Sequence, residues 1–315
     1  GLARLKPLAD DGHFLDLFAQ VKLESKRQCA AWLNSKFGVA VDPSSIFDCH
    51  IKRIHEYKRQ LLNALRIIVL YNRLRENPRL DMAPRTFFFA GKAAPAYTLA
   101  KLIIKFIDSL ARTIAALPAA NRKLQVVFLP DYDVSLAQRL IPASDVSNQI
   151  STAGYEASGT SNMKFMMNGA LTLGTRDGAT IEMAREAGEE NFFLFGLSAD
   201  QVAANRGRYD PRWHYAHDAE TRAALDLIAG GHFGGDAGLF APLYNTLTQT
   251  DYYMHLADLQ SYLEADQRLR DLYARPREWA RKALLNVAAS GKFSSDRTIA
   301  EYAVGIWGVS ACPVP

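Results

Sequence analysis

The chain has 315 residues, 49% of them hydrophobic and 22% charged, and its formal net charge is +4. This composition is typical of a globular protein, and the mixed charge signs exclude the strongly basic surface of a nucleic-acid-binding protein. A mild excess of positive charge still suits anionic ligands. The three cysteines, Cys29, Cys49 and Cys312, are far apart and match no metal or redox spacing. We therefore expect no metal site and a reducing, cytoplasmic compartment.

The sequence contains no targeting or membrane signal. Its amino terminus lacks the apolar run of a signal peptide, and the apolar stretches 67–70 and 102–107 are too short to span a bilayer. We find no internal repeat and no low-complexity segment. Because the sequence begins with Gly1 instead of Met, we expect it to start inside a longer gene product.

Short apolar runs alternate with amphipathic helical patterns up to about residue 197. Phe47, Cys49 and Ile51 alternate with polar residues, which is the period-two pattern of a strand, and a helical stripe of apolar residues begins at Tyr57. This alternation predicts an α/β fold with a Rossmann-like, doubly wound parallel sheet. The predicted strands are 47–51, 86–90, 124–129, 170–174 and 191–195, with helices at 94–110 and 134–141 between them.

After residue 197 the pattern changes to helices and loops. We predict long helices at 258–273 and 276–289 and a final helix at 297–307. The glycine-rich loop at 230–235 follows no strand and precedes no Gly-Lys-Ser/Thr sequence, so it is not a phosphate-binding loop. Without a linker rich in Pro or Ser, the chain is expected to form one domain. Its parts are a helical lead-in at 1–45, an α/β core at 46–250 and a helical tail at 251–315.

The first candidate site lies in the segment EASGTSNMKFMMNGALTLGT, residues 156–175. Small and polar residues at 158–162 precede a short apolar helix. Open backbone N–H groups and the helix dipole make such a position an anion site. Lys164 lies about one turn further along the helix, so its amine can reach the same pocket. An anion site beside a lysine suits a phosphate-bearing aldehyde cofactor, whereas the alternative is a capped helix with an ordinary surface lysine.

The second candidate site is the segment KRIHEYKR, residues 52–59, which follows the strand at 47–51 and contains four cations. Ligands of an open parallel sheet bind at the carboxyl ends of strands. Cations at the start of a helix oppose its dipole, and a charge placed against local preference indicates function. The alternative is a solvated helix face whose charges pair with Asp48 and Glu56.

Both segments closely resemble the α-glucan phosphorylases, which include the glycogen, starch and maltodextrin phosphorylases, and the likeness extends from about residue 23 to residue 307. The resemblance implies pyridoxal 5′-phosphate as the cofactor. It also implies a carboxy-terminal half of a larger enzyme built from two Rossmann-like halves, the GT-B glycosyltransferase architecture. Many family members have Gly where this chain has Ser161. Asp133 stands where some relatives have Arg, and we assign it no role.

The resemblance also implies roles for individual residues. Lys52, Arg53, Lys58 and Lys164 match the family's catalytic positions. The cofactor would be carried by Lys164 and held by Gly159, Thr160, Ser161, Lys52 and Tyr132. The substrate would be bound by Arg53, Tyr57, Lys58, Glu156, Ser158 and Gly159, with Arg53 and Lys58 on its phosphate and Glu156 on sugar hydroxyls.

The implied reaction converts α-1,4-glucan and phosphate into glucose 1-phosphate and a shortened glucan. The cations would offset the repulsion between the substrate phosphate and the cofactor phosphate. The missing amino-terminal half would supply a glycine-rich loop, a histidine and the glucan-binding surface, none of which this sequence contains. We therefore expect this chain to bind the cofactor but to be slow or inactive alone, and the full-length enzyme to be a homodimer.

Two other functions remain open from the sequence. One is a cofactor-free module that binds a sugar phosphate or glucan, and the other is a nucleotide-sugar glycosyltransferase domain, which would not use Lys164 to hold a cofactor. Three weaker features are interpreted as structural: the loop at 91–95, His55 as a packing or capping group, and the carboxylates of Asp177 and Glu182.

Overall fold

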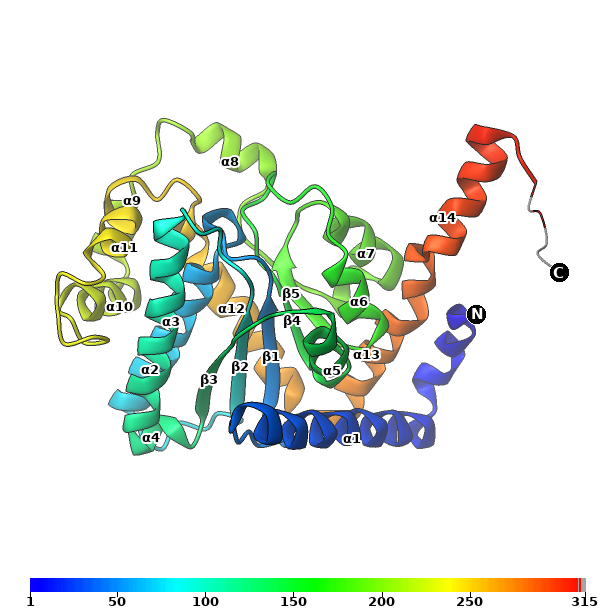
Figure 1. Ribbon diagram of the computed structural model, residues 1–315, viewed down its shortest axis with the longest axis horizontal. Coiled ribbons are helices and arrows are strands. Elements are labelled where there is room, and N and C mark those ends of the chain that lie inside the picture. Colours follow the sequence, from blue (N-terminus) through cyan, green and yellow to red (C-terminus); the bar gives the residue numbers. More distant parts are fainter. Residues whose placement is uncertain (311, 313–315) are drawn as a thin grey trace.

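A six-stranded parallel sheet forms the centre of the computed structural model, which describes residues 1–310 and 312 (Figure 1). The strand order is β3-β2-β1-β4-β5-β6. The strands are β1 (Ile46–Ile51), β2 (Arg85–Ala90), β3 (Leu124–Leu129), β4 (Val146–Gln149), β5 (Leu171–Thr175) and β6 (Phe193–Phe195). Chain order reverses between β1 and β4, so the two halves of the sheet wind in opposite directions from this point. The predicted doubly wound parallel sheet is confirmed.

Strand β4 was not predicted from the sequence. Its residues, Val-Ser-Asn-Gln, include a single apolar residue and therefore lack the usual pattern of a buried strand. It pairs in parallel with both β1 and β5. Its polar side chains are buried because they have partners, such as the Tyr262 hydroxyl that donates to Asn148 Oδ1 over 2.6 Å. The other predicted strands are found within about two residues of their expected bounds.

Helices cover both faces of the sheet because successive strand residues point to opposite sides. Phe87 and Phe89 pack into one core, whereas Phe88 packs into the other. The first core is covered by α2 (Gln60–Glu76), α3 (Thr98–Ala116), α10 (Ala219–Ala229) and α12 (His255–Tyr273). The second is covered by α1 (Gly12–Phe37), α5 (Val134–Ala143) and α6 (Ser161–Met167).

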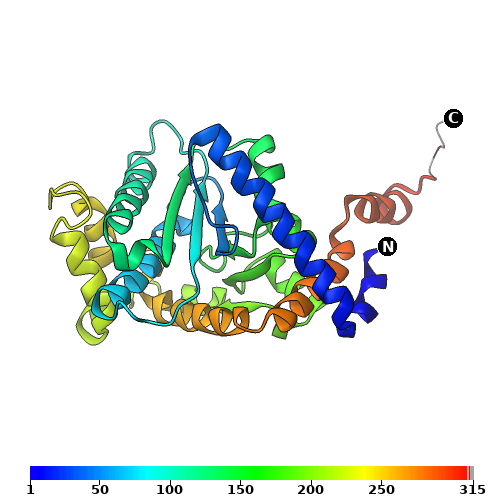
Figure 2. The ribbon, with the colours of Figure 1, turned by 90° about the horizontal axis from the view of Figure 1, so that it is seen from below.

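The remaining helices lie around this layered core. They are α4 (Pro118–Asn121), α7 (Ala179–Ala187), α8 (Ala199–Asn205), α9 (Pro211–His217), α11 (Ala241–Asn245), α13 (Pro276–Ala289) and α14 (Ser295–Tyr302), with 3-10 turns at Leu2–Asp10, Glu56–Lys58, Glu189–Asn191 and Ser290–Phe293. π-helical segments occur at Thr246–Thr250 and at Ala303–Trp307, where the predicted final helix changes its winding. Helix α14 extends away from the sheet (Figures 1 and 2). In the described part of the chain, no helix combines the length and apolar character needed to cross a membrane.

Candidate active site

The cationic segment begins where β1 ends, beside the point at which the strand order reverses. The Lys52 amide donates to the Ala90 carbonyl over 3.0 Å, and the Ile54 amide donates to the Lys92 carbonyl over 3.1 Å. A Cβ atom on Gly91 would lie 1.8 Å from the Lys52 carbonyl oxygen. Only glycine therefore allows the loop after β2 to pass so close to the loop after β1. The structural interpretation of the loop at 91–95 agrees with these contacts.

Lys58 and Glu156 form an ion pair at the carboxyl ends of β1 and β4. Lys58 Nζ donates to Glu156 Oε2, and the two side chains are only 11% and 21% exposed. Burial raises the pKa of Glu156, but the hydrogen bond from Lys58 and the charges of Lys52 and Lys58 outweigh it, so the net pKa is lowered. Glu156 therefore remains ionised at neutral pH.

Lys52 lies close enough to this pair for the three charges to influence one another. Burial lowers its pKa to about 8; the charge of Glu156 acts in the opposite direction, and Lys58 lowers it further. Lys52 also lines a small cavity, about 10 Å³ in volume, together with Glu156, Asn162 and Asp177. A cavity of this size is about the smallest that can hold one water molecule. The cavity joins the cationic segment to the first turn of α6.

The loop that carries Glu156 is held in place by Asp177. One carboxylate oxygen of Asp177 accepts from the Gly154 amide and the other from the Glu156 amide, each over 2.8 Å. The next residue, Gly178, has φ +49°, and a Cβ atom there would lie 2.0 Å from the Glu156 carbonyl oxygen. The structural interpretation of Asp177 agrees with these contacts, but what it positions is a candidate substrate-binding side chain. Glu182 is exposed on α7 and does not share this role.

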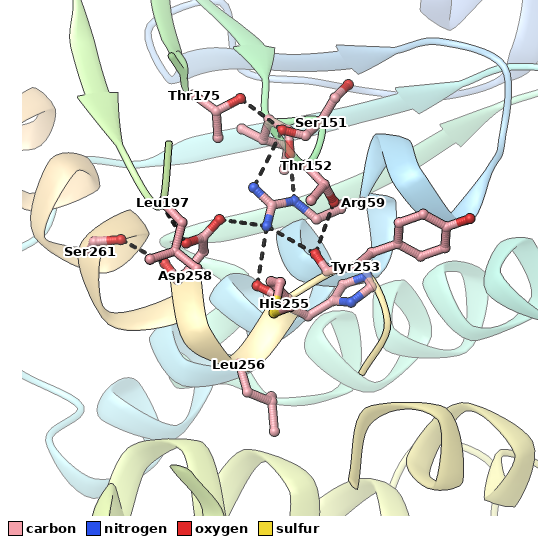
Figure 3. Close-up of polar contacts among 12 residues, drawn as sticks. Arg59, Ser151, Thr152, Thr175, Leu197, Tyr253, His255, Leu256, Asp258 and Ser261 are labelled. Atoms are coloured by element: carbon pink, nitrogen blue, oxygen red, sulfur yellow. Dashed lines mark hydrogen bonds and ion pairs between the residues drawn. The ribbon is translucent and has the colours of Figure 1, made fainter. Parts of the chain in front are cut away.

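One of the four cations of the segment points away from the others. Arg59 adopts left-handed backbone geometry, with φ 58°, and its side chain is fully buried. Its guanidinium donates to Asp258 over 2.6 Å (Figure 3). It also donates to the Ile150 carbonyl over 2.7 Å. The Thr152 amide donates to the Tyr57 carbonyl over 3.0 Å. Arg59 therefore fixes the end of β4 to α12 and does not contribute to the exposed positive charge.

Helix α6 presents backbone amides at its start. Thr160 is its N-cap but makes no side-chain capping bond. Within residues 1–310 and 312, the amides of Gly159, Thr160, Ser161 and Asn162 have no hydrogen-bond acceptor. These N–H groups are therefore available to an anion.

Two of the side chains expected to contact the ligands, those of Lys164 and Arg53, extend into solvent. Lys164 and Arg53 are exposed, and their charged groups form no ion pair with any residue that the structure describes. Tyr132 is half-buried against the cluster that contains Phe165, and burial raises its pKa. An ion pair thus joins Lys58 with Glu156, and Lys52 lines a cavity together with Glu156. The side chains of Arg53 and Lys164 form no hydrogen bond or ion pair with these three residues.

Comparison with known proteins decides the family. The model of a family described as carbohydrate phosphorylase matches residues 1–309. The chain belongs to the carbohydrate phosphorylase family. It is 49% identical over 310 residues to the brain form of glycogen phosphorylase from Homo sapiens. It is 50% identical over 310 residues to the glycogen phosphorylase of Synechocystis sp..

These phosphorylases are considerably longer than this chain. The alignments cover 98% of this chain but only 37% of the human relative and 36% of the cyanobacterial one. The chain therefore spans little more than a third of the length of these relatives. The resemblance to α-glucan phosphorylases predicted from the two motifs is confirmed.

Sequence reasoning missed several polar residues around Lys52. Gln149 and Ser151 at the end of β4, and Thr175 at the end of β5, line the same small cavity. The available signal was that polar residues directly after a buried strand gather at one edge of a parallel sheet. For Gln149 and Ser151 this signal was missed because β4 itself was not recognised.

Proposed function

We propose that this chain is the carboxy-terminal, cofactor-bearing part of an α-glucan phosphorylase that carries pyridoxal 5′-phosphate on Lys164. The observation that carries the proposal is the grouping of Lys52, Lys58 and Glu156 beside the open amides before α6 in a member of the phosphorylase family. The complete enzyme would release glucose 1-phosphate from an α-1,4-glucan by using inorganic phosphate.

The residues present fit this cofactor. The free amides of Gly159, Thr160 and Ser161 suit its phosphate, and the exposed amine of Lys164 is available to its aldehyde. The half-buried ring of Tyr132 can pack beside it. When bound, the cofactor would supply a phosphate group that relays a proton next to the substrate phosphate.

The side chains of this chain would bind and orient the substrate. Lys58 and Arg53 would hold the substrate phosphate, and Lys52 would lie between it and the cofactor phosphate. Glu156 would accept hydrogen bonds from sugar hydroxyls, supported by Tyr57 and by the backbone of Ser158 and Gly159. Because two phosphates in contact repel each other, these cations and amides would stabilise the transition state by about 2–4 kcal/mol per contact.

Reductive labelling tests the cofactor site directly. The chain is incubated with pyridoxal 5′-phosphate and reduced with borohydride, and the modified peptide is identified by mass spectrometry. We expect stoichiometric modification of Lys164 in the wild type and no modification at position 164 in Lys164→Arg. Labelling spread over exposed lysines such as Lys101, or no labelling, would contradict the proposal.

We further propose that phosphorolysis requires the polypeptide corresponding to the rest of the relatives' length. This chain would then bind the cofactor yet turn over slowly or not at all. Assay of the chain with glycogen and phosphate tests this, and full activity would overturn it. In the complete enzyme, the expected homodimer and the cytoplasmic location are part of the same proposal.

A further inference from the structure

A cavity of about 370 Å³ lies at the edge of the sheet opposite to the candidate active site. Two of its lining residues, Asp145 and Gly169, come just before β4 and β5, so the cavity lies at the amino ends of these strands. Its walls come mainly from α1, the end of α12 and α13, and α1 (blue) packs against α13 (orange) in Figure 2. The volume is in the range of small-molecule sites.

The walls of the cavity are mainly apolar. The aromatic rings of Phe18, Tyr273 and Trp279 contribute, together with Pro276 and Ala283. Ala19, at the mouth of the cavity, is exposed on α1. Rings of this kind bind a flat apolar ligand by stacking or edge-to-face contact.

Lys22 introduces a positive charge into this apolar wall. Its ammonium group donates to the carbonyls of Pro142 and Asn168, each over 2.8 Å, and both acceptors are neutral. The nearby charges of Lys26 and Asp145 compensate each other, because these two residues form an ion pair over 2.5 Å. Among residues 1–310 and 312, no carboxylate oxygen lies within 4.0 Å of Lys22 Nζ. The cavity therefore carries one positive charge without a counterion.

Burial makes this charge less favourable than it would be in water. Burial lowers the pKa of Lys22 to about 8; the charge of Asp145 opposes this, and the charge of Lys26 adds to it. A cation enclosed by apolar groups loses hydration and is stabilised by a nearby anion. A ligand with one negative charge would supply that anion without leaving an excess of negative charge.

We propose that this cavity binds a small aromatic carboxylate, with its ring against Trp279 and Phe18 and its carboxylate on Lys22. A phosphate dianion fits the cavity less well, because it brings two charges and needs more donors than the apolar walls provide. A neutral aromatic would leave Lys22 without a counterion. The site is separate from the candidate active site and does not depend on the proposed function.

A pair of probes that differ only in charge tests the proposal. Calorimetric titration of the chain compares 2-naphthoate with the neutral 2-naphthamide. We expect saturable binding of one 2-naphthoate per chain and at least tenfold weaker binding of 2-naphthamide, because only the carboxylate pairs with Lys22.

Three variants locate the binding. Lys22→Met should abolish the preference for 2-naphthoate, and Ala19→Trp should block the mouth of the cavity and weaken binding of 2-naphthoate at least tenfold. Lys101→Met, an exposed lysine on α3, is the matched control and should leave both affinities unchanged. If Lys22→Met fails to fold by circular dichroism, the two probes and Ala19→Trp still decide the question.

The pH dependence provides an independent readout. The charged and titratable groups around Lys22 are Lys26 on the same helix, Asp145 before β4, Cys49 on β1 and Tyr273 on α12. As Lys22 loses its proton between pH 7 and pH 9, affinity for 2-naphthoate should fall by up to about tenfold, and that of 2-naphthamide should not. Equal affinity for the two probes, no saturable binding, or a preference retained in Lys22→Met would each overturn the proposal.

Discussion

The ion pair of Lys58 and Glu156 joins two side chains to which the proposed function assigns different ligands. Lys58 would bind the substrate phosphate, and Glu156 would bind sugar hydroxyls. Both side chains are largely buried, and each charge compensates the other there. Under the proposed function, substrate binding would separate the two side chains or reorient them.

Glu156→Gln should change the affinities for two ligands by different amounts. Inorganic phosphate is expected to bind about tenfold more tightly, because the variant removes a negative charge beside Lys58 and Lys52. The affinity for glucose 1-phosphate should rise less than that for phosphate, or fall, because the sugar loses a charged hydrogen-bond acceptor. Calorimetry with both ligands measures this, with the exposed Glu182→Gln as the control. Unchanged phosphate affinity would contradict the role of the pair.

Lys52 should make stability depend on pH in a defined window. Its pKa is lowered from 10.5 to about 8, so between these values the unfolded chain binds more protons than the folded one. Stability contributed through Lys52 therefore rises as pH increases from about 8 to about 10.5. Urea unfolding across this range should show a smaller rise in Lys52→Met than in the wild type or in Lys101→Met. An equal rise in all three would contradict the prediction.

At the scale of elements, close contacts between loops position the site. The loops after β1 and β2 meet where Gly91 passes the Lys52 carbonyl, and the turn after β5 meets the Glu156 loop at Gly178. In each contact, a loop that follows one strand fixes the position of a residue in a loop that follows another strand. The residue fixed in this way is one that is proposed to bind a ligand. The precision of the site therefore depends on the register of the parallel sheet.

Gly91→Ala is expected to destabilise the chain and to weaken phosphate binding. The added Cβ would lie 1.8 Å from the Lys52 carbonyl oxygen, so the loop carrying Lys52 must move. Gly207→Ala is the matched control, because Gly207 also has positive φ, +77°, but a Cβ there meets nothing within 4 Å. Gly207→Ala should lower the free energy of unfolding by about 1 kcal/mol, because of backbone strain alone. Urea unfolding and calorimetry with phosphate test the difference, and similar losses in both variants would contradict it.

The sequence predicted helices and strands more completely than it predicted the site. β1, β2, β3, β5 and β6 were recognisable because they are rich in apolar residues, whereas β4 was not. Its Asn148 is buried because Asp48 and Tyr262, from distant parts of the chain, bond to it. Such partners are set by the tertiary structure, so local pattern could not indicate the strand or the polar groups at its end.

At the scale of the whole molecule, a buried ionic network joins the sheet to two helices. Arg66 of α2 donates to Asp48 of β1 over 3.0 Å and to Asp266 of α12 over 2.9 Å. Arg85 of β2 also pairs with Asp266, over 2.5 Å. All four side chains are at most 1% exposed. Each charge is tolerated there because the others compensate it.

Removing one member of this network should be costly. Arg66→Met leaves Asp48 and Asp266 with one cation fewer, and we expect a loss of about 3–5 kcal/mol in the free energy of unfolding. Arg112→Met is the control, because its pair with Asp108 is exposed on α3 and should contribute less than about 1 kcal/mol. Chemical denaturation at pH 7 compares them, and equal losses would contradict the prediction.

The network also predicts behaviour in acid. Burial raises the pKa of Asp266, but the charges of Arg85 and Arg66 outweigh it, so the pKa falls to about 2. The stability contributed by this carboxylate is therefore present above about pH 4 and is lost as pH falls toward 2. Acid unfolding followed by circular dichroism should be less steep in Arg66→Met over this range.

The sequence by itself determined the α/β class, the two motifs and the resemblance to the phosphorylases, because these depend on residue types at short and regular spacing. Only the tertiary structure decided which charges act together. It buries the side chain of Arg59 away from the other three cations of its segment, pairs Lys58 with Glu156 and leaves Lys22 without a counterion in an apolar cavity. The physical reason is that an ionic contact depends on burial and on partners about 100 or more residues away, which spacing along the chain does not specify.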